Sequence, residues 1–450
     1  MGESMRRLLL LSAFLLAPPV VASTTTAFIN VNVIPMTQER IDWNQTVVIA
    51  DGIITRIGDV ESVPIPEDAE VVDGTDRYLI PGLADMHAHV PVSESQELSR
   101  VLTLFAANGV TTIRGMLGHS SHLNLRQQLL EGEIFGPRLV TSGPSLNGNS
   151  VSGADDGARQ VREQKAAGYD FIKIHPGLTF AEYAAIAHTA NEIGIPFAGH
   201  VPVALGVEGA LAAGRATIDH LDGYLAALMP VNSDPSGGYG GFFEVLLAGK
   251  LNEDRIGELA ARTAAAGTWN VPTESLFENR VSGMSVVELG SRPEMRYMSR
   301  ATVAQWARVK QAQETERGYD AKLGARAIEI RRRLILALHT AGAGLLLGSD
   351  APQVFNVPGF SAHHELGFLV AAGLTPYEAL ATGTTAISTF LGSNTGTISV
   401  GRIADLVLLD ANPLEDMSNS RRIHGVMLDG TWHSASELEQ RLAAYIEHDE

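Results

Sequence analysis

Six residues of metal-binding types close short apolar segments of this chain. They are His87, His89, Lys173, His200, His220 and Asp350. Each lies at or near the end of a strand-like run, and parallel strands bring such ends together at one face of a barrel. Nitrogen and oxygen ligands without sulfur suit zinc, with manganese, cobalt or iron as replacements. The set therefore predicts one metal centre, and centres of this composition usually activate water.

The positions of the first three residues in strand-like runs say more about their role than their residue types do. His87 and His89 are two apart, so on a strand both side chains point to the same face. Lys173 lies in the apolar run Phe171–His175, where burial would hold its amine neutral because a buried charge is costly. A neutral amine can add carbon dioxide and become a carbamate, a carboxylate-like ligand that bridges two metals. The alternative for Lys173 is a salt-bridged core lysine.

The later histidines and the aspartate each close an apolar run. We expect Asp350 to be both a metal ligand and a proton acceptor, its alternative being a helix N-cap. His200 and His220 are expected ligands, and Asp219 and Asp222 flank His220 and are expected to orient it or to cap the next helix. Five protein ligands and a carbamate exceed the three of a mononuclear catalytic zinc. The set therefore predicts two divalent ions roughly 3.5–4 Å apart.

The segments that carry these residues alternate between strand-like and helix-like patterns. Helix-period apolar segments include residues 181–193 and 328–341. Eight strand candidates lie at 80–90, 110–116, 138–142, 171–175, 197–201, 217–220, 269–273 and 345–350. Eight such units predict an α/β fold in which residues 80–393 form a (β/α)8 TIM barrel. An open doubly wound sheet is the runner-up, but no strand is followed by a Gly-x-Gly-x-x-Gly turn.

Both ends of the chain have a β-like texture instead. Alternating runs that suggest short antiparallel strands lie at 28–34, 46–52 and 53–58, the last two joined by an Asp-Gly turn. Similar runs recur at 396–400, 404–410 and 425–432. We therefore expect a small β-sandwich built from residues 23–79 and 394–450, the second segment including a C-terminal helix.

The composition and the N-terminal residues limit the partners and the cellular location that the protein can have. The 450 residues carry a formal net charge of -18, which argues against nucleic acid and anionic membrane surfaces as partners. The absence of cysteine excludes disulfides, a lipid-modified cysteine and thiolate metal ligands. Arg6 and Arg7 precede the apolar run Leu8–Leu16, and Val20–Ala22 offers a small-residue cleavage site. We expect residues 1–22 to be a signal peptide of a periplasmic or secreted protein that leaves the membrane after cleavage, an uncleaved anchor being the alternative.

The six residues lie within longer motifs. These are Pro81–His89, Phe171–His175, Gly199–Pro202, Asp219-His220, Gly348–Asp350 and, near the C-terminus, Gly396–Pro413. Together they resemble the amidohydrolase superfamily, in the branch of imidazolonepropionase-like and prolidase-like metallohydrolases. The resemblance covers nearly everything after the signal segment. It implies the barrel and the binuclear centre, and it says little about the substrate.

The resemblance also implies a role for each residue. The more buried ion would be held by His87, His89 and Asp350, and the more exposed one by His200 and His220. Carbamylated Lys173 would bridge the two ions together with a hydroxide that attacks a substrate carbonyl. Asp350 would take the proton and pass it to the leaving amine.

Three further residues are candidates for contacts with a substrate. In similar enzymes a tyrosine soon after the fourth histidine polarises the substrate carbonyl, and Tyr224 matches that position, with packing as its alternative. Arg114, at the end of the second strand, is expected to receive a substrate carboxylate or to form a surface ion pair. His175 shares a strand face with Lys173 and is expected either near the substrate or in packing.

These expectations describe an exported, binuclear metal-dependent amidohydrolase. Its substrate would be a small amide, such as a dipeptide with a C-terminal proline or an N-acyl amino acid. A cyclic amide, a lactone or an ester stays open, because the same hydroxide attacks any of them. Lys173 argues against a mononuclear deaminase, and the complete set of six residues argues against a non-catalytic binding protein. Barrels of this family are commonly dimers or larger, which leaves a homo-oligomer open.

Overall fold

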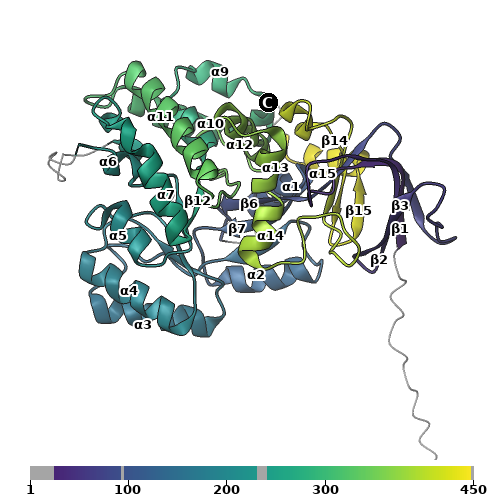
Figure 1. Cartoon of the computed structure of the whole chain (residues 1–450), viewed down its shortest axis with the longest axis horizontal. Coiled ribbons are helices and arrows are strands. Elements are labelled where there is room, and N and C mark those ends of the chain that lie inside the picture. The colour runs from purple at the N-terminus through teal and green to yellow at the C-terminus, as the bar shows by residue number, and fades with distance from the viewer. Residues whose placement is uncertain (1–24, 93–95, 231–240, 447–450) are drawn as a thin grey trace, which may run out of the picture.

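The computed structural model describes residues 25–92, 96–230 and 241–446. The expected signal peptide, residues 1–22, lies outside these ranges, as does most of the glycine-rich run 235–241. Figure 1 shows two parts, a sheet with strands from both ends of the chain and a larger central α/β domain. Among the described residues, no helix is long and apolar enough to cross a membrane.

The terminal sheet takes its strands from both ends of the chain. They are β1 (Thr25–Val33), β2 (Asp42–Ala50), β3 (Ile53–Asp59), β4 (Glu70–Asp73), β5 (Tyr78–Pro81), β13 (Leu406–Leu409), β14 (Ile423–Leu428) and β15 (Thr431–Ser434). The order is β15-β14-β13-β5-β1-β2-β3, with β4 paired to another part of β1. The two ends meet where β5 pairs antiparallel with β13, over a core shared by β1, β2, β5, β13 and β14. The sequence predicted a sandwich here, whereas the hydrogen bonds define one eight-stranded sheet.

Turn residues explain which of the terminal runs become strands. Asp51 and Gly52 have φ angles of 50° and 74°, the left-handed pair that a type I′ turn requires, and they join β2 to β3 as predicted. The run 396–400, by contrast, is not a strand. Gly396 and Gly401 turn the chain at its two ends, with φ angles of 77° and 88°.

The central domain is built on short parallel strands. They are β6 (Leu83–Ala88), β7 (Val110–Gly115), β8 (Arg138–Thr141), β9 (Ile172–Ile174), β10 (Phe197–Gly199), β11 (Thr217–Asp219) and β12 (Trp269–Val271). They form one sheet of β6, β7 and β8 and a second of β9 to β12. Each lies within a run that the sequence predicts to be a strand.

Isolated parallel bridges connect these two sheets on both sides. The bridges are Ser142–Phe171, Asn270–Leu345 and Ala88–Ala351. The segment 345–351, predicted to contain the eighth strand, therefore lies between β12 and β6, although single bridges and not a full ladder mark its pairing. The arrangement is an α/β fold consistent with a TIM-barrel-like domain.

Helices follow most of these strands and surround the central domain (Figure 1). The α-helices are α1 (Gln96–Ala107), α2 (Ser121–Leu130), α3 (Ala154–Ala167), α4 (Phe180–Ile193), α5 (Gly206–Ala212), α6 (Tyr224–Ala227), α7 (Ile256–Ala266), α8 (Glu274–Val281), α9 (Val286–Gly290), α10 (Arg300–Glu314), α11 (Ala321–Thr340), α12 (Phe360–Ala371), α13 (Pro376–Thr382), α14 (Thr385–Leu391) and α15 (Ala435–Ala443). Four 3-10 helices accompany them: η1 (Phe242–Leu247), η2 (Glu253–Arg255), η3 (Pro293–Tyr297) and η4 (Met417–Arg421). The helices predicted at 181–193 and 328–341 correspond to α4 and α11, and α15 is the expected C-terminal helix.

Candidate metal centre

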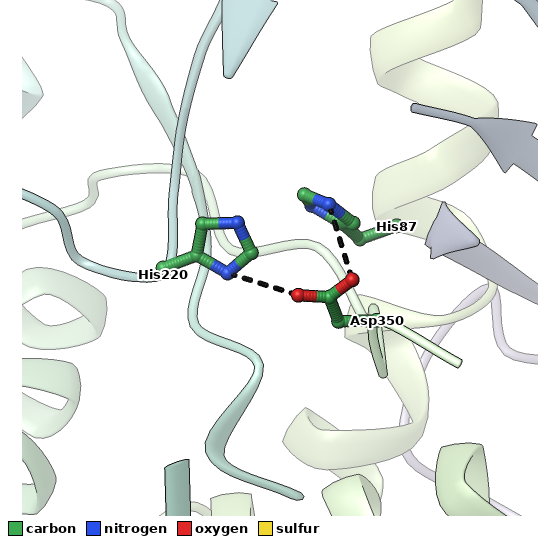
Figure 2. A group of neighbouring side chains, drawn as sticks. All are labelled: His87, His220 and Asp350. Carbon is green, nitrogen blue, oxygen red and sulfur yellow. Dashed lines mark ion pairs between the residues drawn. The ribbon is translucent and has the colours of Figure 1, made fainter. Parts of the chain in front are cut away.

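Three of the six predicted residues meet directly. One potential ligand atom from each of His87, His220 and Asp350 lies within 4.8 Å of the other two, and all three residues are buried. Figure 2 shows their side chains pointing toward one another. Asp350 Oδ1 is 3.6 Å from His87 Nε2, and its Oδ2 is 3.6 Å from His220 Nδ1. Two imidazoles and a carboxylate at these separations form a candidate site for a divalent cation.

His89 and His200 extend this group toward its more exposed side. His89 Nε2 lies 2.7 Å from Asp350 Oδ1, and the ring centroid of His200 lies 4.7 Å from that of His220. The side chains of His89 and His200 are 22% and 15% exposed, whereas those of the first three residues are buried. The histidines and the aspartate therefore form one cluster at neighbouring strand ends, and their role as ligands stays a prediction.

Lys173 lies in the middle of β9 and is almost fully buried, with 1% of its surface exposed. Its Nζ has no hydrogen-bond partner among the described residues, and the carboxylate Oδ2 of Asp219 is 3.7 Å away. Burial lowers the pKa of this amine to about 8, so more of it is neutral near pH 7 than in an exposed lysine. The next strand leaves room for the side chain at Gly199, where a Cβ would lie 2.8 Å from Lys173 Cδ.

The strand ends around the cluster have unusual backbone conformations. His220, Thr273 and Asp350 have left-handed φ angles of 64°, 53° and 62°. Such conformations cost about 1–3 kcal/mol each and persist where the surroundings fix them, often at functional sites. The buried Arg331 fixes two of the strand ends, because Nη1 donates to the His220 carbonyl at 2.7 Å and Nη2 to the Pro272 carbonyl at 2.9 Å.

Two of the histidines have a fixed partner for Nδ1. His220 Nδ1 is 2.8 Å from Thr273 Oγ1, and that hydroxyl already donates to a backbone carbonyl, so Nδ1 is the donor and Nε2 keeps its lone pair. His200 Nδ1 is 3.1 Å from Asp222 Oδ2, which also accepts from the Val201 amide at 3.0 Å. The sequence expected Asp222 to orient His220, but it orients His200. Partners of this kind fix the tautomer of a metal-binding imidazole.

Asp219 does not orient its neighbour His220 either. Its Oδ2 faces His87 Nδ1 at 3.3 Å, and its Oδ1 accepts from Arg114 Nη2 at 3.2 Å. Burial alone would raise the pKa of Asp219, but the guanidinium of Arg114 and the adjacent His87 hold that pKa well below its usual range. The side chain of Asp219 points into the centre of the domain toward β6 and β7, so its partners come from strands distant in sequence.

The charge states of the cluster suit a divalent cation. Burial lowers the pKa of His87 to about 4, which leaves the imidazole neutral. Burial opposes the ionisation of Asp350, but its interactions with the neighbouring His87 and His89 outweigh burial and lower its pKa. Neutral imidazoles and an ionised carboxylate are the forms that bind metal. Lys173 Nζ makes no hydrogen bond among the described residues, whereas Asp350 Oδ1 lies 2.7 Å from His89 Nε2; a buried amine of this kind needs a partner. A metal ion and a carbamate would supply one.

Two expected substrate contacts lie elsewhere. The Tyr224 hydroxyl is fully buried and lies 3.0 Å from Thr263 Oγ1 on α7, because the left-handed Gly223 turns the chain into α6 and directs the ring outward. Tyr224 therefore does not face a substrate carbonyl. Arg114 is only 2% exposed, and its Nε donates to the Met86 carbonyl at 2.7 Å. It lies inside the domain beneath the cluster, which corrects the expectation of a substrate carboxylate there.

Aromatic rings cover the exposed side of the cluster. The His175 ring stacks on His200 with centroids 5.1 Å apart, and burial and the Lys173 charge lower its pKa to about 2. Its contact with a substrate stays a prediction. The Phe243 ring stacks on His220 at 4.6 Å and on His200 at 6.2 Å, a contact that sequence reasoning missed. The only signal was a long loop after the last histidine, and ring packing from a loop is not a local property.

The chain resembles proteins of known class over most of its length. The family model described as "Amidohydrolase family" matches residues 78–433. The ochratoxinase of Aspergillus niger is 24% identical over 399 residues, which cover 83% of this chain and 79% of that protein.

Solved structures agree in fold. A bottromycin amidohydrolase superposes with a TM-score of 0.70 at 23% identity, covering 94% of this chain and 90% of its own. A Xaa-Pro dipeptidase with bound methionine gives a TM-score of 0.64 at 20% identity, covering 91% of this chain and 100% of its own. The A. niger ochratoxinase structure gives 0.64 at 20% identity, covering 91% and 95%. With the family model spanning most of the chain and the candidate site at the strand ends, this chain belongs to the amidohydrolase family.

Proposed function

We propose that this chain is an exported, binuclear metal-dependent amidohydrolase that cleaves an amide bond of a small substrate. The observation that carries the proposal is the burial of two histidines and an aspartate within 4.8 Å of one another in a member of a hydrolase family. The proposed ligands of the inner ion are His87, His89 and Asp350, and those of the outer ion are His200 and His220. Lys173, as a carbamate, would help to hold both ions.

Lys173 and Asp350 carry the proton chemistry. In the proposal, Lys173 Nζ adds to carbon dioxide and releases one proton, which its lowered pKa favours. The two ions, proposed to be zinc, supply Lewis-acid activation of a water molecule and of the scissile carbonyl when bound. The ionised Asp350 carboxylate would take one proton from a water molecule as the water oxygen adds to the carbonyl carbon. It would return that proton to the amide nitrogen as the carbon–nitrogen bond breaks, so that a carboxylic acid and a neutral amine are formed.

The surrounding residues keep this centre in place. Asp222 and Thr273 accept from Nδ1 of His200 and His220, which leaves the lone pair of each Nε2 free to bind a metal. His175 stacks beside His200 at the partly exposed side, where we propose that it contacts the substrate. Neutral at ordinary pH, its imidazole can donate one hydrogen bond and accept another.

The substrate proposed is a dipeptide with a C-terminal proline or an N-acyl amino acid. The activities after which two similar structures are named, a Xaa-Pro dipeptidase and a bottromycin amidohydrolase, support small amides. Export rests on the proposed signal peptide at residues 1–22, which would deliver the enzyme to the periplasm or outside the cell.

Metal content and one substitution test the centre. We expect about two metals per chain in the dialysed protein by elemental mass spectrometry, a number set by the two-ion arrangement. Lys173→Ala should lose the second metal and most activity, whereas the control Lys165→Ala, on the exposed surface of α3, should keep both. Full turnover by Lys173→Ala would refute the bridging role. No metal after reloading with zinc and bicarbonate would refute the enzyme proposal itself.

A substrate panel tests the reaction class. Dipeptides ending in proline, N-acyl amino acids, cyclic amides and lactones should be compared at equal metal loading. We expect the highest kcat/KM for an open-chain amide. Turnover of lactones or cyclic amides alone would replace the proposed substrate class while leaving the metal centre intact.

A further inference from the structure

A cavity lies at the end of the central strands that is remote from the metal centre. Its volume is about 500 Å³, within the range of cavities that hold small molecules. Its lining comes from the beginnings of the strands, since Arg138 opens β8, Phe171 precedes β9 and Ala216 precedes β11. His200 and His220, by contrast, follow β10 and β11. The cavity and the metal centre therefore lie at opposite ends of the same strands.

Arg114 forms the inner end of this cavity. Its guanidinium carbon lies 5.3 Å and 5.8 Å from the ring centroids of Phe171 and Phe390, which also line the cavity. Nε and Nη2 are used by a backbone carbonyl and by the side chains of Thr217 and Asp219. Nη1 has no acceptor among the described residues. A guanidinium that is 98% buried, with an unused donor beside an apolar space, is suited to an anionic oxygen.

The other two charged side chains of the lining, Arg138 and Asp170, each form ion pairs through one of their terminal atoms. Arg138 Nη2 lies 3.2 Å from Asp405 and 3.3 Å from Asp429, and its remaining nitrogens have no acceptor among the described residues. The carboxylate in the lining, Asp170, accepts through Oδ2 from Arg126 Nη1 at 2.8 Å and from a backbone amide. The two arginines therefore keep unused donors, Asp170 keeps Oδ1 as an unused acceptor among the described residues, and the walls between them are mainly apolar.

We propose that this cavity binds a small organic carboxylate with an aromatic or aliphatic body. The carboxylate would accept from Arg114 Nη1, and the body would pack against Phe171, Phe390, Val140 and Ala216. The volume admits a ring with a short side chain and excludes a macromolecule. Binding of a carboxylate in this cavity does not depend on the proposed function, whereas its effect on metal retention rests on the proposed metal centre.

A ligand in the cavity would contact the same guanidinium that supports the metal centre. Arg114 Nη2 donates to Asp219 at 3.2 Å, and Asp219 Oδ2 faces His87 Nδ1 at 3.3 Å and Lys173 Nζ at 3.7 Å. A carboxylate on Nη1 shares the charge that otherwise faces Asp219. The cavity is therefore an effector site, and its occupancy changes how tightly the centre holds metal.

The test uses the metal-loaded protein and 4-fluorophenylacetate, followed by fluorine NMR. Ala216→Leu fills the cavity, and Ala265→Leu, on the exposed surface of α7, is the matched control. We expect wild type and Ala265→Leu to bind the probe with equal Kd, and Ala216→Leu to bind at least tenfold more weakly. Equal affinity in both variants would place the probe outside the cavity and overturn the proposal, as would no binding at millimolar concentration.

Recognition of the charged head is tested from the ligand side. Arg114→Gln would leave Asp219 buried without its counter-ion and can unfold the protein, so the uncharged 4-fluorophenylacetamide replaces it as the comparison. We expect the amide to bind at least tenfold more weakly than the carboxylate, and equal binding would refute the role of Arg114. The carboxylate should also change the rate at which a chelator removes metal at least twofold in wild type and not in Ala216→Leu. An unchanged rate would overturn the effector role.

Discussion

Asp222 offers a graded test of how the protein holds the outer metal. Both hydrogen bonds that it accepts, from His200 Nδ1 and from the Val201 amide, end on the same oxygen, Oδ2. Asp222→Asn can place its amide oxygen at that position and keep both hydrogen bonds while losing the charge. Asp222→Ala removes the acceptor of both bonds. The two variants therefore separate the charge of the carboxylate from its position.

The expected losses follow from these contacts. Removing the partner of a metal-binding histidine costs 10–100-fold in metal affinity, or about 1.4–2.7 kcal/mol. Asp222→Ala should weaken metal affinity by about 100-fold, because nothing then orients the His200 ring. A hydrogen bond to a charged acceptor is roughly twice as strong as one to a neutral acceptor. Asp222→Asn should therefore lose about half of that free energy, or about tenfold in affinity.

Competitive titration of the metal-free protein with zinc and a chromophoric chelator measures the two affinities. We expect the weaker site alone to shift, in the order wild type, Asp222→Asn, Asp222→Ala. The control Asp68→Ala, at an exposed carboxylate of the terminal sheet's β3–β4 connection, should match wild type. Two unshifted sites in Asp222→Ala would refute the assignment of His200, and equal losses in both Asp222 variants would refute the argument from the shared oxygen.

Further predictions concern residues away from this pair. Burial lowers the pKa of His363 from 6.5 to about 4, so the folded state binds its proton less readily than the unfolded state does. As the pH falls from 6.5 to 4, the free energy of unfolding should therefore decrease by about 3 kcal/mol. In urea unfolding, His363→Gln should show a flatter dependence of this free energy on pH, and a profile identical to wild type would contradict the prediction. Gly199→Ala forces a φ of 114° and a clash with the buried lysine, so it should destabilise by more than about 2 kcal/mol, whereas Gly257→Ala, with open space around it in α7, should not. Phe243→Ala removes the ring stacked on His220 and should raise KM about tenfold with kcat nearly unchanged in steady-state assays; an equal fall in kcat would instead indicate damage to the centre.

The position of a residue could be predicted from the sequence where it depends on a single strand. The strand ends that carry His87, His200 and His220 were predictable because short apolar runs and turn residues are local signals. The partners of Asp219 were not, since they lie on strands that meet it only in the folded domain. The predicted substrate contact of Tyr224 was wrong for a related reason, because the left-handed Gly223 and the packing of α7 set the direction of its ring.

The segment 345–350 has the sequence pattern of an eighth strand, but only single bridges, and no full ladder, join it to its neighbours. The segment 345–350 begins with three leucines and lies between β12 and β6. Its backbone also bonds outside the two sheets, as from the Leu347 amide to the carbonyl of Thr382, the last residue of α13. Sequence periodicity reports burial and cannot distinguish these two kinds of backbone partner.

The pairing of β5 with β13 has a consequence for the order of synthesis. Strands β1 to β5 leave the ribosome first, yet their shared core needs β13 and β14, which are made more than three hundred residues later. The central domain lies between them in sequence, so its strands can associate before the terminal sheet closes. A nascent chain thus keeps an open sheet edge at β5 until its last residues appear, and such edges are sites of aggregation. C-terminal truncations that remove β13 should therefore harm solubility before they harm the central domain.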